Sequence, residues 1–63
     1  MKTYQLHFRD ETGGVRRTLT LKMETDDGAQ KLARTLENEH GIEVWLASRR
    51  IAVVDPDGKV NRV

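Results

Sequence analysis

The feature that most constrains the fold is a single stretch of helical periodicity inside a chain that otherwise alternates. Within residues 25–41 one stripe recurs every three or four positions and consists of Ala29, Leu32, Ala33, Leu36 and His40. Asp27 and Gln30 fit a capping box at its start, where carboxylates also suit the helix dipole, and Gly41 can close its end in a left-handed conformation. The sequence therefore predicts one amphipathic helix over residues 26–40.

Before this helix, two segments alternate with the period of a half-buried strand. In residues 1–9 the side chains of Tyr4, Leu6 and Phe8 fall on one side, opposite the polar ones. Turn residues follow at 10–14, and residues 15–23 alternate again. The inward set of this second strand is Val15, Leu19, Leu21 and Met23, with Arg17 on the same side by parity. We predict a hairpin.

After the helix, residues 42–47 and 50–55 form a second predicted hairpin. A tight turn about Ser48 and Arg49 would pair Leu46 with Ile51 and Val44 with Val53. Residues 55–58, DPDG, are typical of a turn. Residues 59–63 are expected to return as a short edge strand or to fray.

These elements predict a single α+β domain, residues 1–63, with the order ββαββ. A right-handed crossover through the helix gives a four-stranded antiparallel sheet in the order 2-1-3-4. The helix then covers one side of the sheet, and we call the other side the open face. Its predicted members are Gln5, His7, Arg9, Arg16, Thr18, Thr20, Lys22, Glu43, Trp45, Ala47, Arg50, Ala52 and Val54.

Composition narrows the classes of function. Sixty-three residues, 37% of them apolar and none of them cysteine, make a small core, so self-association is an economical source of extra stability. A formal net charge of +1 provides no global field toward nucleic acid or membrane. The chain lacks an apolar run of about 20 residues and a signal-peptide core. We therefore expect no membrane segment. We also expect a cytoplasmic protein, because the absence of cysteine suits a reducing compartment.

No group of residues has the pattern of a catalytic or metal site. His7 and His40 lack a second histidine or a cysteine at metal-ligand spacing, and His40 is expected to cap the helix. Asp55 and Asp57 match only part of a calcium loop. Ser48 has no evident base. We therefore predict a protein that is not an enzyme and has no metal or other cofactor.

Trp45 is the strongest candidate for a binding residue, because alternation places the only tryptophan on the open face. Tryptophan and arginine are enriched among the anchors of protein interfaces. We predict a non-enzymatic protein-interaction module, a homodimer formed through the open face or an edge strand. The predicted interface residues are Trp45, Ala52, Val54, Arg50 and His7. The alternative that Trp45 rests on its own tail or on neighbouring arginine stems remains open.

A second hypothesis is a small nucleic-acid-binding module. Single-stranded nucleic acid requires cations along its backbone and aromatic side chains for its bases. The residues that could serve are Arg9, Arg16, Lys22, Arg50 and Trp45. One tryptophan in place of two or three aromatic residues, with Glu43 close by, argues against this hypothesis.

Three segments together resemble a family of short, uncharacterised bacterial proteins: YQLHFRDETGG, TDDGAQKLARTL and IEVWLASRRIAVV. In that family an aromatic first strand ends at an Asp and Gly turn, an Asp-capped helix follows, and a Val-Glu-Val/Leu-Trp segment precedes a basic hairpin. The resemblance covers nearly the whole chain and implies a bacterial source. It assigns no functional residue, and the DPDGKVNRV tail extends past the usual end.

Overall fold

The computed structural model describes residues 1–63. Along the chain it has two strands, then one helix, then three further strands. The bounds are Lys2–Arg9 for β1, Val15–Met23 for β2, Asp26–Thr35 for α1, Ile42–Leu46 for β3, Arg49–Val54 for β4 and Val60–Arg62 for β5.

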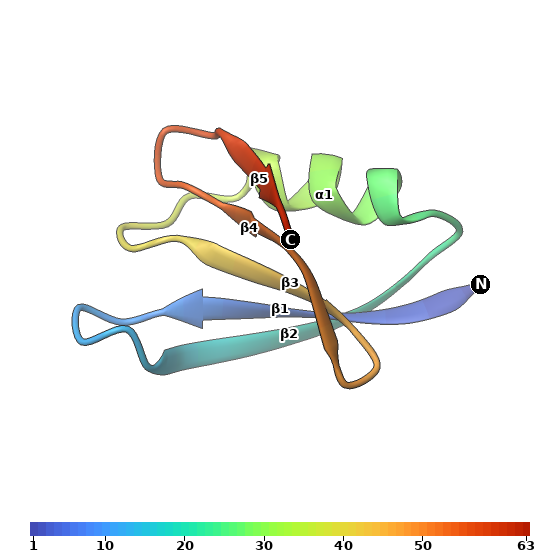
Figure 1. Ribbon diagram of the computed structural model, residues 1–63, viewed down its shortest axis with the longest axis horizontal. Helices are drawn as coiled ribbons and strands as arrows, with labels where there is room; N and C mark the ends of the chain where they lie inside the picture. The colour runs from blue at the N-terminus through green and yellow to red at the C-terminus, as the bar shows by residue number, and fades with distance from the viewer.

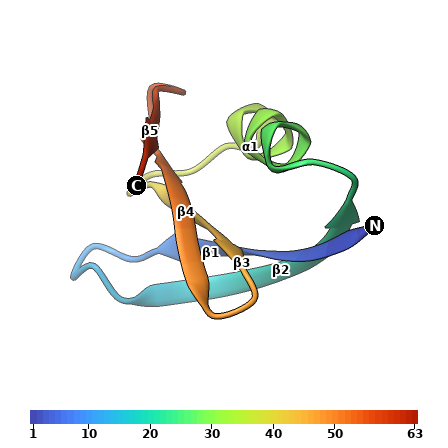
Figure 2. The ribbon, with the colours of Figure 1, turned by 45° about the vertical axis from the view of Figure 1, so that its right-hand side comes forward.

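All strands join one antiparallel sheet in the order β2-β1-β3-β4-β5. The α+β class is confirmed, but the sheet has five strands where we predicted four. The fifth strand follows a tight turn in which the Gly58 N–H donates to the Asp55 carbonyl (2.9 Å). Figures 1 and 2 show β4 and β5 curling up beside α1, so the helix lies on the concave side of the sheet.

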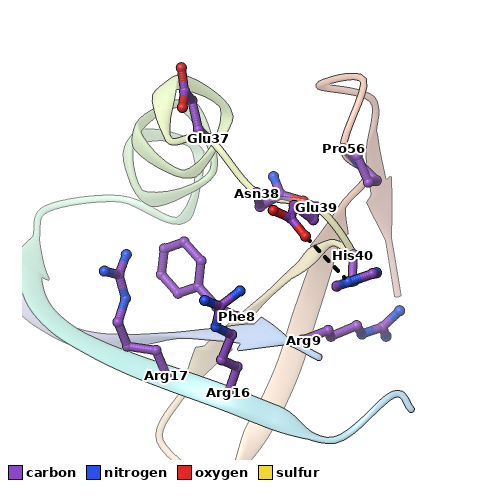
Figure 3. Close-up of a pocket in the computed structure, with 9 residues that line it drawn as sticks. All are labelled: Phe8, Arg9, Arg16, Arg17, Glu37, Asn38, Glu39, His40 and Pro56. Atoms are coloured by element: carbon purple, nitrogen blue, oxygen red, sulfur yellow. Dashed lines mark ion pairs between the residues drawn. The ribbon is translucent and has the colours of Figure 1, made fainter. Parts of the chain in front are cut away.

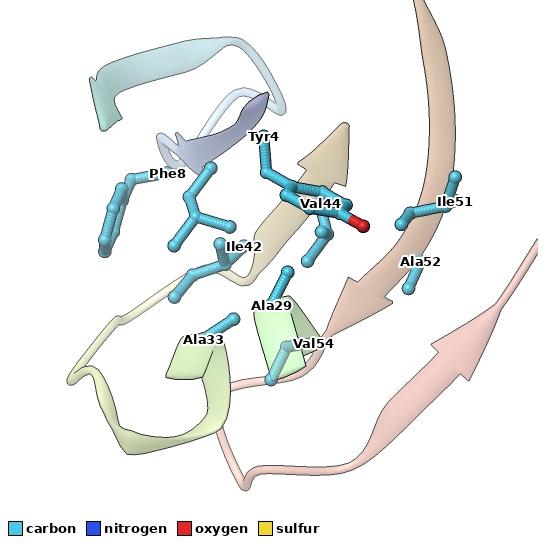
Figure 4. Packing of buried hydrophobic residues seen from close by; sticks show 10 residues of the cluster. Tyr4, Phe8, Ala29, Ala33, Ile42, Val44, Ile51, Ala52 and Val54 are labelled. Carbon is cyan, nitrogen blue, oxygen red and sulfur yellow. The ribbon is translucent and has the colours of Figure 1, made fainter. Parts of the chain in front are cut away.

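The core lies between α1 and this concave side (Figure 4). The helix contributes only the small residues Ala29 and Ala33, which allow its backbone to approach the strands closely. The buried apolar residues are Tyr4, Leu6, Phe8, Ala29, Ala33, Ile42, Val44, Ile51, Ala52 and Val54. The predicted inward sets of β1 and β3 are thus confirmed, with Leu46 half-buried at the margin.

Tyr4 ties β1 to the start of the helix. Its side chain is fully buried, and its hydroxyl donates a hydrogen bond to the Asp26 carboxylate. Burial, and then this hydrogen bond and the negative charge of Asp26, raise the pKa of Tyr4 to about 12. The phenol therefore keeps its proton throughout the neutral range.

The helix differs from prediction at both ends. Its N-cap is Thr25, whose hydroxyl accepts the Gly28 N–H (3.0 Å), so the predicted capping box of Asp27 and Gln30 is wrong. Its last residue is Thr35, five positions before the predicted end, and the Thr35 hydroxyl donates to the Leu32 carbonyl (2.7 Å). The following residues include two glutamates, whose charge opposes the negative end of the helix dipole.

Consequently His40 does not cap the helix, and Gly41 does not end it. His40 is exposed, with its Nε2 atom 3.7 Å from a Glu39 carboxylate oxygen. Gly41 has a positive φ of 103° and lies directly before β3. Its carbonyl accepts the Arg9 N–H (3.0 Å), so this glycine positions the start of β3 beside the end of β1.

The β3–β4 hairpin also differs from prediction. The turn is formed by Ala47 and Ser48, because Ala47 adopts a positive φ of 55° and Leu46 pairs with Arg49. The predicted turn was one residue later. A positive φ is uncommon for alanine, so nothing in the composition of this segment indicated the earlier turn.

A register shift in the same hairpin reverses the predicted orientation of the end of β4. Trp45 pairs with Arg50, but Val44 pairs with Ala52, which leaves Ile51 as the extra residue of a bulge. The prediction that Ala52 and Val54 lie on the open face is therefore wrong, since their exposed fractions are 0% and 1% within the core. Val53, opposite Glu43, takes the open-face position and is half-buried.

Strand β2 has the predicted bounds but is poorly covered. Leu21 and Met23 are half-buried. Leu19 lies on the predicted side, opposite Leu6, but is 40% exposed, whereas Val15 pairs with Arg9, contrary to its predicted inward position, and is 52% exposed. The reason is that α1 packs mainly over β3 and β4, while β2 lies at the rim of the sheet. Apolar side chains are left partly in contact with solvent there.

Candidate functional site

The open face is organised around Glu43, in the middle of β3. Its carboxylate accepts hydrogen bonds from the Trp45 indole (Nε1–Oε1, 3.0 Å), the Arg9 guanidinium (Nε–Oε2, 3.0 Å) and Arg50 (Nη1–Oε2, 3.3 Å). The Glu43 side chain is only 13% exposed. One acidic group therefore binds three side chains that could otherwise bind a ligand.

The charge of Glu43 is stabilised despite this burial. Burial alone would raise the pKa of its carboxyl, but hydrogen bonds from Trp45, Arg9 and Arg50, together with the positive charge of Arg9, outweigh this effect and lower the pKa below its usual value. Glu43 is thus ionised at neutral pH. A carboxylate held in this state is unsuited to act as a general acid or base near neutrality.

Trp45 is also covered from within its own chain. The His7 ring stacks on it with a centroid separation of 5.2 Å and an interplanar angle of 25°. Gln5 lies within hydrogen-bonding distance of His7 (Oε1–Nε2, 3.2 Å), and Glu43 lies 3.9 Å from the other ring nitrogen. Trp45, His7 and Arg50 therefore meet on the open face, without the predicted apolar surround of Ala52 and Val54. The predicted apolar docking patch is absent.

Arg16 is not part of this cluster. A register shift near Phe8 and Arg9 disturbs the start of β2, and Figure 3 shows the Arg16 and Arg17 side chains pointing together toward the segment that follows α1. The proposed nucleic-acid residues are thus divided, because Arg16 lines the groove beside the helix end together with Arg9, whereas Lys22 pairs with Thr3 at the other end of β1. Two of the remaining cations are bound to Glu43.

The arginines of β2 line a groove of about 640 Å³ beside the helix end (Figure 3). The Arg17 guanidinium lies 4.3 Å from the centroid of the Phe8 ring, a cation–π contact that shields the edge of the core. Across the groove lie Glu37, Glu39 and His40. Charges of both signs line it, and it holds neither a cysteine nor a serine that could act as a nucleophile.

The longest strand margin without a neighbouring strand is the outer edge of β2. This strand is nine residues long, pairs with β1 on one side, and has no strand on the other. In an antiparallel pair, alternate residues direct their N–H and C=O groups away from the partner strand, so this side presents unpaired backbone groups. We call residues Val15–Met23 with these outward groups the β2 edge. The predicted strand order already placed this strand at the margin of the sheet. It did not predict that Leu19 would be exposed there.

Comparison with known proteins adds no relative from which a role could be transferred: no family model, curated protein or solved structure matches the chain. The resemblance to short bacterial proteins therefore stays a prediction. No group of three potential metal ligands occurs in the structure. The ten-residue helix is shorter and less apolar than a helix that crosses a membrane.

Proposed function

We propose that this protein is a non-enzymatic protein-interaction module that self-associates, and that its contact runs along the β2 edge. The observation that carries the proposal is the nine-residue margin of the sheet, with Leu19 40% exposed beside it. Exposed strand edges bind a further strand through backbone hydrogen bonds, while adjacent side chains supply apolar contact. This form of recognition requires no pocket and no catalytic group.

The open face is a weaker candidate for the contact. Its central groups already have partners, since Glu43 accepts from Trp45, Arg9 and Arg50. A partner docking there would have to replace these hydrogen bonds or bury their charges. Of the two contacts that the sequence analysis predicted, the open face and an edge strand, we therefore propose the edge strand.

The size of the core supports association. Only 12 of 63 residues are buried, and the four half-buried or exposed apolar side chains of β2, Val15, Leu19, Leu21 and Met23, lie outside that set. Domains of this length have little stability to spare. Covering Leu19, Leu21 and Met23 with a second chain would enlarge the apolar area removed from water.

The experiment is the solution mass of Thr20→Lys. Thr20 is exposed in the middle of β2, so lysine fits the isolated chain but adds charge where a neighbouring strand must pair. Multi-angle light scattering should give twice the chain mass for the unmodified protein and the monomer mass for Thr20→Lys.

Gln5→Lys is the matched control. Gln5 lies directly opposite Thr20 in β1, one strand further from the margin, and is also exposed. Gln5→Lys adds the same charge to the same face but away from the margin, so this variant should remain dimeric. A folded, monomeric unmodified protein, or equal dissociation of both variants, contradicts the proposal.

A further inference from the structure

We infer that the partner of the β2 edge is a second copy of this chain, aligned antiparallel with Thr20 on the two-fold axis. This inference rests on the proposed function, in which the chain already self-associates, and adds the symmetry and register with which the two β2 edges pair. The two sheets, each of five strands, would then join into one of ten, with both helices on the same side.

The length of undisturbed strand selects this register. Strand β2 is disturbed at its start, where Arg9 pairs with Val15 and Phe8 with Arg17, so Arg16 is the unpaired residue of the bulge. An axis at Thr20 pairs residues 17–23 of both copies and leaves the bulge out. An axis at Leu19 would draw the bulge into the interface, and one at Leu21 would pair only residues 19–23.

The side chains fit the same register on the apolar side. Leu19 and Leu21 lie on the helix side of β2, opposite Leu6 and Tyr4 of β1. With Thr20 on the axis, Leu19 faces Leu21 of the second copy, and this contact occurs twice. Such apolar pairs directly opposite one another stabilise neighbouring strands.

The charges fit as well. Lys22 comes opposite Thr18, four residues along the strand from the other Lys22, a separation of about 13 Å that exceeds the screening length in physiological salt. Beyond the paired segment Glu24 comes beside Arg16, which is opposite in sign. An axis at Leu19 would instead set Lys22 against Arg16, two like charges that destabilise strand pairing.

Disulfide trapping tests this arrangement, because the chain contains no cysteine and every introduced thiol is unambiguous. Residues directly opposite each other in antiparallel strands lie about 4.5–5.5 Å apart between Cα atoms, which a disulfide can bridge. Thr20→Cys should therefore form a covalent dimer with itself under mild oxidation. Leu19→Cys should not do so alone, but should cross-link in an equimolar mixture with Leu21→Cys.

The outcomes separate the register from the edge. If Leu19→Cys cross-links alone and Thr20→Cys does not, the axis lies at Leu19, and the inferred register falls while the proposed use of the β2 edge stands. If no β2 cysteine cross-links although the unmodified protein has twice the chain mass, both fall, because assembly uses another surface. A monomeric unmodified protein overturns the proposed function itself. Circular dichroism of each reduced variant establishes that it is folded.

Discussion

The open face and the β2 edge differ in how far their binding groups are already used. On the open face Glu43 holds Arg9, Arg50 and Trp45, and the His7 ring covers part of the indole. On the β2 edge the outward backbone groups have no strand beside them, and Leu19 is exposed. Charged and aromatic side chains are thus a poor guide to a free surface, because they can bind one another. The outward backbone groups of an edge strand, by contrast, cannot pair with one another and stay available to another strand.

The largest expected effect tests whether the side chains at the end of β4 point into the core or toward the open face. Ala52→Asp should cost about 3 kcal/mol or more of the free energy of unfolding, because Ala52 is fully buried and a carboxylate there has no partner. Thr3→Asp, at an exposed site on β1, should change it by about 0.5 kcal/mol or less. Urea unfolding measures both. Equal, mild effects would mean that Ala52 faces solvent and that the open face is more apolar than described.

A pH experiment tests the core beneath both regions. The folded-state pKa of Tyr4, raised to about 12, exceeds the usual 10, so its contribution to stability is complete below pH 10 and is lost as the pH rises toward and through 12. The difference in unfolding free energy between the unmodified protein and Tyr4→Phe should shrink by about 2 kcal/mol between pH 9 and 12. A constant difference over this range would show that Tyr4 is neither buried nor bonded to Asp26.

The next effect concerns the centre of the open face. Glu43→Gln should lower the free energy of unfolding by about 1–2 kcal/mol, because it removes the charge that binds Arg9 and Arg50. The folded-state pKa of Glu43 is lowered, so its contribution is present above the usual carboxyl pKa and is lost as the pH falls through the lowered one. Acid unfolding followed by Trp45 fluorescence should show a flatter pH dependence in the variant.

The same variant sharpens the comparison when its mass is measured. Glu43→Gln should stay dimeric, since the open face takes no part in the proposed contact. A folded but monomeric Glu43→Gln would place the contact on the open face.

The smallest effect distinguishes the two arginines of the β2 bulge. Arg17→Ala should lower the free energy of unfolding by about 0.5–1 kcal/mol, because Arg17 lies over the Phe8 ring. Arg16→Ala should have almost no effect, because Arg16 makes no ion pair or cation–π contact in the structure. Thermal unfolding of the two variants side by side measures the difference. Equal losses would show that the contact over Phe8 contributes nothing.

Periodicity predicted what depends on local pattern. The inward positions of Tyr4, Leu6 and Phe8 follow from alternation, as does the placing of Trp45 with His7 and Arg50. These predictions succeeded because β1 is regular from Tyr4 to Phe8 and keeps its register with β3. Strand parity is reliable wherever no residue is inserted.

Parity failed where a residue was inserted. The bulge at Ile51 turned Ala52 and Val54 into the core, and the bulge at Arg16 set Val15 opposite Arg9 in place of its predicted inward position. Neither bulge is marked by a glycine, and Ala47 takes the positive φ of the turn where a glycine or an asparagine would have been expected. These features arise from contacts between strands, which a single segment does not reveal. The exposure of Leu19 depends likewise on where the helix packs.

The most direct test of the account is hydrogen exchange at the backbone amides of β2, measured as protein concentration is raised. If the β2 edge pairs with a second copy, the outward amides between Thr18 and Lys22 should exchange quickly at low concentration and become protected at high concentration, while the Glu43 and Trp45 amides, already paired within the sheet, stay unchanged. Protection of β2 that does not depend on concentration in a monomeric protein would contradict the account.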